Sequence, residues 1–273
     1  MSTYPGGKEA CRHKLINLIP PHRVYIEPFL GGGAIMRNKR PAQLSVGVEM
    51  NEEVLWETAL QVTMDPIVVS GDVDGLRGLR ELNPFRNEAQ YIFMHNDALR
   101  VLGFLPGEPG MFIYCDPPYL RSTRKSQDRL YDHEFWTEDQ HEQLLVLLGG
   151  MACDVMISGY KSDLYLDLLK GWHHYTFQSM TRGGGLAEEW VWMNYAPPTL
   201  LHDYRYLGDD FRQRERIKRK KTRWVERFKK LDQQERAAIL WALGESGIIK
   251  QNLFELTSPE SASMPAVTSS SPQ

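Results

Sequence analysis

Short apolar runs, typical of buried strands, alternate along much of the chain with stretches whose apolar residues recur every three or four positions, as in helices. The apolar runs predict strands over residues 23–27, 44–48, 91–94, 111–115, 154–158, 173–179 and 189–194. The clearest helices are predicted over residues 51–60 and 137–148. Because strands that alternate with helices pair in parallel, the pattern predicts an α/β fold with a mostly parallel sheet. The last two strands are expected to form an antiparallel hairpin.

The pattern changes after a Pro-Pro pair at residues 197–198. Residues 204–230 are strongly charged with helical spacing, and residues 233–243 predict a second helix. The end of the chain is rich in Ser, Thr and Pro, a composition typical of disorder. The sequence therefore predicts three parts: a sheet domain over residues 1–198, a basic helical extension over 199–250 and a disordered tail over 251–273.

Charge is divided unevenly along the chain. The 273 residues carry a net charge of −3, but the segment from Arg212 to Lys230 has eleven Lys and Arg against two acidic residues, or +9. The remainder carries −12. Such a segment is typical of phosphate-backbone contact, so nucleic acid is the expected partner. The alternative is a solvated helix that packs Trp224 and Phe228 on the sheet.

Other features narrow the class of protein. Cys11, Cys115 and Cys153 are odd in number and share no spacing, which indicates reduced thiols rather than disulfides or a zinc site. Residues 1–20 are polar, unlike a signal peptide, and the longest apolar stretch is far shorter than the ~20 residues of a membrane helix. No histidine pair has the spacing of a metalloprotease helix. We expect a cytoplasmic protein without a membrane segment or a metal.

Asp116-Pro117-Pro118-Tyr119 directly follows the most apolar strand, residues 111–115. In an open α/β sheet, ligands bind beyond the carboxyl ends of the strands, where this tetrapeptide falls. The prolines hold the backbone extended, which presents the Asp116 carboxylate and the Pro117 carbonyl as two rigid acceptors. Two acceptors suit an exocyclic amine, and a planar base can stack on Tyr119. The alternative is a Pro-Pro turn that merely ends a strand.

A second candidate site follows the first strand, from Glu27 through Gly31, Gly32 and Gly33. Glycines there allow a ligand to approach the backbone closely. The stretch is neither a Walker phosphate loop nor a G-x-G-x-x-G dinucleotide motif. Glu49 ends the second strand, where an acid can accept hydrogen bonds from ribose hydroxyls; the alternative is a solvated residue at a helix entry.

In order and spacing, these motifs resemble the Dam-like (D12 class) DNA adenine-specific methyltransferases. The resemblance rests on Tyr4-Pro-Gly-Gly-Lys8, on the Glu27-Pro-Phe stretch and on the Asp-Pro-Pro-Tyr tetrapeptide. Weaker matches lie at residues 96–98, 135–137, 158–160 and 189–194, so the resemblance covers residues 4 to 195. The basic segment at 214–221 resembles an extension found in some bacterial and phage-related members.

The resemblance implies a class I methyltransferase (Rossmann-like) fold, with a mostly parallel seven-stranded sheet and an antiparallel terminal hairpin. It also implies S-adenosylmethionine as cofactor. The residues implied to bind the cofactor are Tyr4 and Lys8 beside its methionine moiety, Glu27, Phe29, Gly31, Gly32 and Gly33 along its cleft, Glu49 at the ribose, and Asp97 at the adenine amine, with Asp116 close by. Asp116, Pro117, Pro118 and Tyr119 would hold the target adenine after it is flipped out of double-stranded DNA.

Basic residues supply the expected DNA contacts: Arg121, Arg124, Lys125 and Arg129 after the tetrapeptide, Arg182 in a glycine-rich turn, and Lys218, Arg219, Lys220 and Lys221 in the basic segment. The long target-recognition insert of the family is absent, so a short recognition element is expected within residues 60–95. The alternatives are a methyltransferase acting on cytosine, RNA or a protein glutamine, and a DNA-binding protein without turnover.

Overall fold

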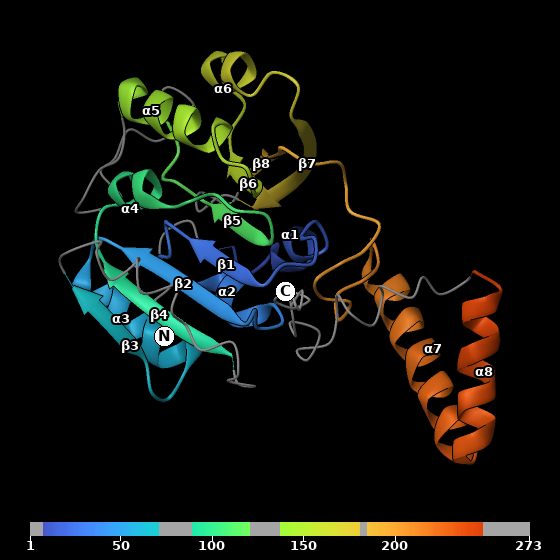
Figure 1. Cartoon of the computed structure of the whole chain (residues 1–273). Helices are drawn as coiled ribbons and strands as arrows, with labels where there is room; N and C mark the ends of the chain where they lie inside the picture. Colours follow the sequence, from blue (N-terminus) through green and yellow to red (C-terminus); the bar gives the residue numbers. More distant parts are fainter. Residues whose placement is uncertain (1–7, 71–88, 121–136, 181–184, 248–273) are drawn as a thin grey trace, which may run out of the picture. The chain divides into compact units, whose positions relative to one another are not determined.

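The computed structural model describes residues 8–70, 89–120, 137–180 and 185–247 of the chain. It divides them into two compact units, the first ending at Tyr206 and the second beginning at Leu207. The first unit is built on one sheet (Figure 1). Its strands are β1 (Val24–Glu27), β2 (Leu44–Glu49), β3 (Ile67–Ser70), β4 (Gln90–His95), β5 (Met111–Cys115), β6 (Asp154–Gly159), β7 (His173–Met180) and β8 (Leu186–Met193).

The strand order is β3-β4-β2-β1-β5-β6-β8-β7. The first six strands in that order are parallel, whereas β8 runs antiparallel to both β6 and β7. The predicted α/β fold with an antiparallel terminal hairpin is thus confirmed. The described residues form eight strands rather than seven because β3 adds to the edge of β4. This short, half-exposed strand has too few residues to reveal its period in the sequence.

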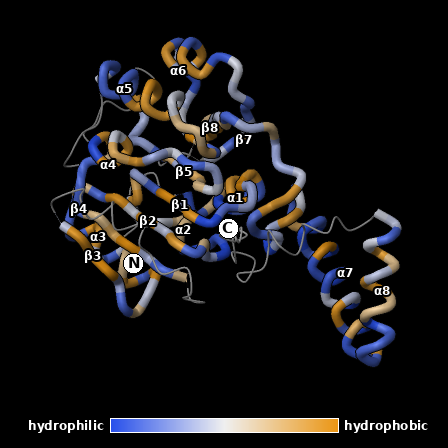
Figure 2. The backbone as a smooth tube through the Cα atoms, in the orientation of Figure 1, coloured by the Kyte–Doolittle hydropathy of each residue, from blue (hydrophilic) through white to orange (hydrophobic). Residues whose placement is uncertain are grey.

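Helices cover both faces of the sheet. They are α1 (Arg12–Ile16), α2 (Ala34–Asn38), α3 (Glu52–Val62), α4 (Ala98–Phe104), α5 (Glu138–Gly149) and α6 (Asp163–Leu168). In β5, Ile113 and Cys115 contribute to the core shared with α4, α5 and α6, whereas Phe112 and Tyr114 contribute to the core shared with α1, α2 and α3. This alternation, with both faces buried, explains why the strand contains no charged residue. In Figure 2, orange hydrophobic segments run through the sheet and the helices that cover it.

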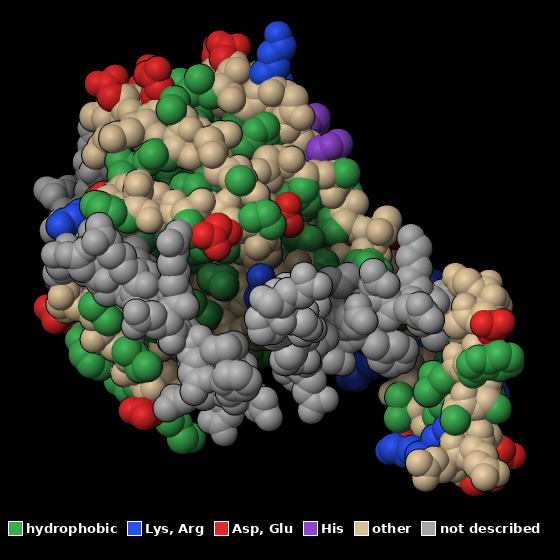
Figure 3. Space-filling model, viewed as in Figure 1, with side chains coloured by type: hydrophobic (Ala, Val, Ile, Leu, Met, Phe, Trp, Pro, Cys, Tyr) green, Lys and Arg blue, Asp and Glu red, His purple; other side chains and the backbone are tan. Residues whose placement is uncertain are grey.

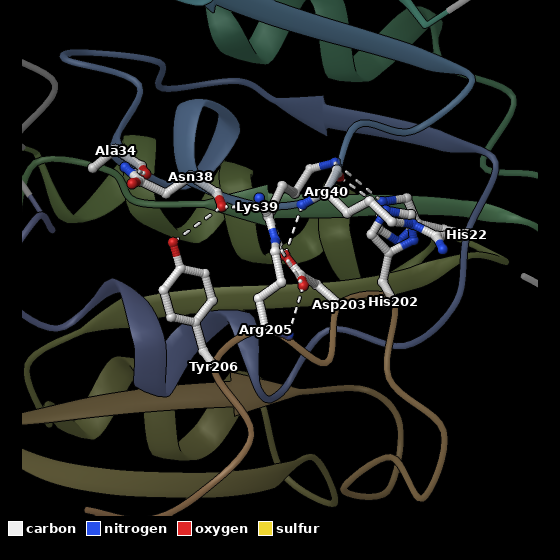
Figure 4. Close-up of polar contacts among 9 residues, drawn as sticks. All are labelled: His22, Ala34, Asn38, Lys39, Arg40, His202, Asp203, Arg205 and Tyr206. Carbon is white, nitrogen blue, oxygen red and sulfur yellow. Dashed lines mark hydrogen bonds and ion pairs between the residues drawn. The ribbon is translucent and has the colours of Figure 1, made fainter. Parts of the chain in front are cut away.

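The segment after β8 is tied to the end of α2 by buried polar contacts (Figure 4). Asp203 Oδ2 accepts a hydrogen bond from the backbone N–H of Arg40 at 2.8 Å and pairs with the guanidinium of Arg205 at 2.7 Å. The ring of His202 stacks on His22 with centroids 3.8 Å apart. These contacts explain why the first unit continues past the predicted boundary at residue 198 to Tyr206.

The second unit contains α7 (Phe211–Lys230) and α8 (Gln233–Glu245). Side chains of Asp210 and Asp232 cap these helices, so α7 begins at Phe211 rather than at residue 204. Neither helix has a buried residue, and Trp241 is 70% exposed. The predicted disordered tail, 251–273, lies outside the described residues. No helix in the described ranges is long and apolar enough to cross a membrane.

Candidate active site

Polar side chains gather where the parallel strands end. Glu49 ends β2, Asp97 follows β4, Asp116 follows β5, and Ser158 lies near the end of β6. The carboxyl ends of parallel strands meet at one edge of a sheet, which is where α/β proteins bind their ligands. The sheet therefore brings these four residues to the same edge.

Lys8, Asp116, Tyr119 and Glu189 form one group, the acid–lysine cluster, in which Lys8 and Glu189 are buried and Asp116 and Tyr119 are partly exposed. The Lys8 ammonium nitrogen lies 3.0 Å from Asp116 Oδ1 and 3.4 Å from Glu189 Oε2. It also donates a hydrogen bond to the Tyr119 hydroxyl and lies 4.7 Å from the centre of that ring. One ammonium ion is thus shared by two carboxylates and a phenol.

Two serines hold the carboxylates of the acid–lysine cluster. Ser158 Oγ donates to Asp116 Oδ1 at 2.7 Å and lies 3.2 Å from the Tyr114 hydroxyl. Ser179 Oγ donates to Glu189 Oε1 at 2.8 Å. Since the contacts of Lys8 and Ser158 are both made to Oδ1 of Asp116, they fix the orientation of its carboxylate.

Burial and charge set the protonation states of the cluster. Burial alone would lower the pKa of Lys8, but the facing carboxylates of Asp116 and Glu189 raise it well above its usual value. Lys8 is therefore an ammonium ion. Burial raises the pKa of Asp116, an effect that Lys8 opposes and Glu189 reinforces. Burial also raises the pKa of Tyr119 well above its usual value, so its hydroxyl stays protonated.

The glycine turn after β1 depends on left-handed backbone angles and on close contact with Thr58 of α3. Gly31 and Gly33 have φ angles of 46° and 58°, which favour glycine. A Cβ atom on Gly33 would lie 2.7 Å from a side-chain carbon of Thr58, and the hydroxyl of Thr58 donates to the Gly31 carbonyl at 2.7 Å. Only glycine fits there.

Glu49 is bound to the same turn. Its Oε2 accepts from the backbone N–H of Gly31 at 2.9 Å, and its Oε1 accepts from that of Asn51 at 3.0 Å. Each carboxylate oxygen can accept two hydrogen bonds, and the side chain is partly exposed. Asp97 is also partly exposed and caps α4, accepting from the Arg100 N–H at 2.9 Å.

Other predicted residues have different surroundings. Glu27 is buried, and its Oε2 accepts from the Tyr25 hydroxyl at 2.8 Å and the Met36 N–H at 3.2 Å. It therefore ties β1 to α2 on the face of the sheet that α1, α2 and α3 cover. Phe29 packs against the core on the opposite face. Lys8, expected beside the cofactor's methionine moiety, pairs with Asp116.

The predicted DNA contacts and Tyr4 fall into two groups. Lys218, Arg219, Lys220 and Lys221 are exposed on α7 in the second unit. The others lie outside the described residues, and they are Tyr4, Arg121, Arg124, Lys125, Arg129 and Arg182. Among the described side chains, no three His, Cys, Asp or Glu residues are grouped as a metal site would require.

Glu189 and Ser158 were not predicted as site residues, although both lie in segments that match the family weakly. The available signal for Glu189 was its position in the alternating pattern of its strand, which predicts that its carboxylate is buried. A buried carboxylate needs a partner. The partner, Lys8, is far away in sequence, so only the fold reveals the pair.

Comparison with known proteins finds one family. The model of the D12 class N6 adenine-specific DNA methyltransferases matches residues 4–56 and 79–182, more than half of the chain. No curated protein sequence matches the chain significantly.

Solved structures with some similarity to this chain include three methyltransferases. An rRNA methylase from Streptococcus thermophilus is 12% identical, with 71% of this chain and 97% of that chain covered and a TM-score of 0.39. A magnesium protoporphyrin IX methyltransferase from Synechocystis PCC 6803, with bound SAM, is 14% identical, with coverages of 67% and 74% and a TM-score of 0.37. A SAM-dependent methyltransferase from Agrobacterium tumefaciens is 11% identical, with coverages of 67% and 60% and a TM-score of 0.37. Similarity at this level assigns no substrate.

Proposed function

Because the chain belongs to the D12 class N6 adenine-specific DNA methyltransferases, we propose that the acid–lysine cluster is its catalytic site. The enzyme transfers a methyl group from S-adenosylmethionine to the N6 amine of adenine in DNA. In this proposal the DNA is double-stranded, and the adenine is flipped out of the helix to reach Asp116. We expect the enzyme to act where that DNA is, in the cytoplasm of a bacterial or phage-infected cell.

The residues of this chain fit S-adenosylmethionine. Glu49 is a partly exposed carboxylate beside a turn that only glycine can form, and its oxygens are suited to accept from ribose hydroxyls. Asp97 follows β4, the neighbour of β2 in the sheet, and its carboxylate can accept a hydrogen bond from an adenine amine. The cofactor supplies a methyl group on a positively charged sulfur. Phe29, Gly32 and Tyr4 belong to the same proposed cleft, whereas the buried contacts of Glu27 favour a structural role.

Asp116 carries the proposed chemistry. The N6 amine is a poor nucleophile because its lone pair is delocalised into the ring. Asp116 Oδ2 and the Pro117 carbonyl would accept the two N–H groups and so favour an amine whose lone pair points at the methyl carbon. As the carbon–nitrogen bond forms and the carbon–sulfur bond breaks, S-adenosylhomocysteine would leave, and the carboxylate would stabilise the positive charge on nitrogen until the extra proton passes to water. Lys8 and Ser158 hold Oδ1, which keeps this geometry fixed.

Tyr119 and the basic residues would hold the DNA. The Tyr119 ring meets Tyr160 edge-on, with centroids 4.5 Å apart, which fixes its orientation for stacking on the flipped base. Pro118 keeps the backbone extended between that ring and the amine acceptors. Phosphate contacts are assigned to residues 218–221, Arg121, Arg124, Lys125 and Arg182, and base recognition to residues 60–95.

The observation that carries the proposal is the fixed orientation of the Asp116 carboxylate. We predict that Asp116→Ala abolishes methyl transfer because no carboxylate remains to hold the amine, while affinity for DNA changes by less than about threefold. Asp167→Ala is the control, since Asp167 is exposed on α6. Methyl transfer and DNA affinity are measured on both variants, with melting temperatures to establish folding. Retained turnover in a folded Asp116→Ala enzyme would contradict the proposal.

A further inference from the structure

The acid–lysine cluster holds two carboxylates and one ammonium ion. Lys8 lies 3.0 Å from Asp116 Oδ1 and 3.4 Å from Glu189 Oε2, and the side chains of the two acids are only 18% and 10% exposed. The formal charge of the group is therefore −1. Lys8 and Ser158 suffice to fix the orientation of Asp116. The carboxylate of Glu189 must therefore have another role.

Hydrogen bonds and an ion pair hold the Glu189 side chain in this position. Its Oε1 accepts from Ser179 on β7, and its Oε2 lies 3.4 Å from the Tyr119 hydroxyl as well as facing Lys8. Buried carboxylates are costly unless they are paired and hydrogen-bonded, and here the pairing partner is one that Asp116 also needs. The shared lysine thus neutralises neither acid completely.

We propose that Glu189 is a positioning residue that keeps the acid–lysine cluster at a charge of −1, so that the cluster as a whole presents net negative charge toward the reacting centre. This inference rests on the proposed function of the cluster. It adds a residue that acts through Lys8 and does not itself touch the substrate.

The charge suits the reaction. A positive charge lies on the cofactor's sulfur before transfer and on the adenine nitrogen during it. Close to the reacting atoms in a buried site, a net charge of −1 would stabilise the positive charge throughout the transfer. Without Glu189, Lys8 would pair with Asp116 alone, and the cluster would be neutral.

A purely structural role makes a different prediction. If Glu189 only anchored Lys8 and β8, its loss would weaken the binding of every cofactor analogue to the same degree. If it sets the charge, its loss should weaken the binding of positively charged S-adenosylmethionine and spare S-adenosylhomocysteine, whose sulfur is neutral.

The test is Glu189→Gln, which keeps the shape and removes the charge. The control is Glu188→Gln at the neighbouring exposed position, where the carboxylate accepts from the Trp190 indole at 2.9 Å. Affinities for S-adenosylmethionine and S-adenosylhomocysteine are measured by calorimetry without DNA, and kcat with DNA. For Glu189→Gln we expect about a tenfold loss of affinity for the first ligand, less than about twofold for the second, and a kcat lowered about 10- to 100-fold. Glu188→Gln should match the wild type in all three.

Equal losses for both ligands, or no loss for either, would overturn the inference. If Glu189→Gln fails to fold, Glu189→Asp provides the test, because it keeps the charge and must retain the wild-type ratio of the two affinities. A ratio shifted against S-adenosylmethionine in folded Glu189→Asp would also overturn the inference. Failure of the proposed function is seen separately, because the wild-type enzyme would then transfer no methyl group to DNA.

Discussion

Glu27 shows how burial changes the behaviour of a single carboxyl group. It lies between the Tyr25 hydroxyl and the Met36 N–H, and burial raises its pKa to about 8 from an ordinary value of 4.5. The hydrogen bonds from these neighbours oppose this effect but do not cancel it. Glu27 is therefore largely protonated at neutral pH, which suits a structural link between β1 and α2 better than a ligand contact.

The pH dependence of stability tests this assignment. Because the folded state holds the Glu27 proton more tightly than the unfolded state, the stability it contributes falls as pH rises from about 4.5 to about 8. The Gln side chain of Glu27→Gln cannot titrate. The free energy of unfolding of this variant should therefore rise relative to that of the wild type as pH increases across this range. Urea denaturation between pH 5 and 8 measures the difference. Parallel profiles for the two proteins would contradict the assignment, and exposed Glu142 supplies the control variant Glu142→Gln.

Individual residues were predictable to different extents. The location of Asp116 and Glu49 at the ligand-binding edge of the sheet could be predicted, because each acidic residue ends an apolar strand. The pairing of Lys8 with Asp116 and Glu189 could not be predicted, because these partners come from two other parts of the chain. Pairing across the fold depends on strand order, which local patterns do not contain.

At the level of elements, helices and strands with full periods were predicted well. The strand at residues 111–115 and the helix that Asn51 caps appear as expected. β3 was missed because four half-exposed residues carry little hydrophobic signal. α7 was predicted from charge and spacing together, and all of its basic residues except the partly buried Arg214 are exposed.

The charge of α7 leads to a prediction about DNA affinity. Replacing Lys218, Arg219, Lys220 and Lys221 with Glu should weaken binding to DNA of every sequence, because phosphate contacts carry no sequence information. The slope of log affinity against log salt should shrink by about 0.9 for each phosphate that the helix no longer neutralises. Fluorescence anisotropy between about 50 and about 200 mM salt measures both effects. Lys170→Glu, an exposed single reversal in the first unit, is the control. Unchanged affinity at every salt concentration would remove α7 from the interface.

The whole molecule combines an acidic sheet unit with a basic helical one. Its net charge of −3 is the sum of +9 between Arg212 and Lys230 and −12 elsewhere. Figure 3 shows acidic side chains over the α5 and α6 side of the first unit. The sequence predicts a sheet domain that ends at residue 198, whereas the compact first unit continues to Tyr206, where Asp203 and Arg205 bind the end of α2. Polar contacts between distant segments leave no periodic signal.

Methylation of adenine at N6 by the whole chain can be measured directly. The full chain is incubated with S-adenosylmethionine labelled on its methyl group and with unmethylated double-stranded DNA, RNA and protein in parallel. Digestion to nucleosides or amino acids then locates the label. We expect all of the label in N6-methyladenine from DNA, and none with Asp116→Ala. Label in cytosine, RNA or protein, or no label anywhere, would show that the chain does not have this activity.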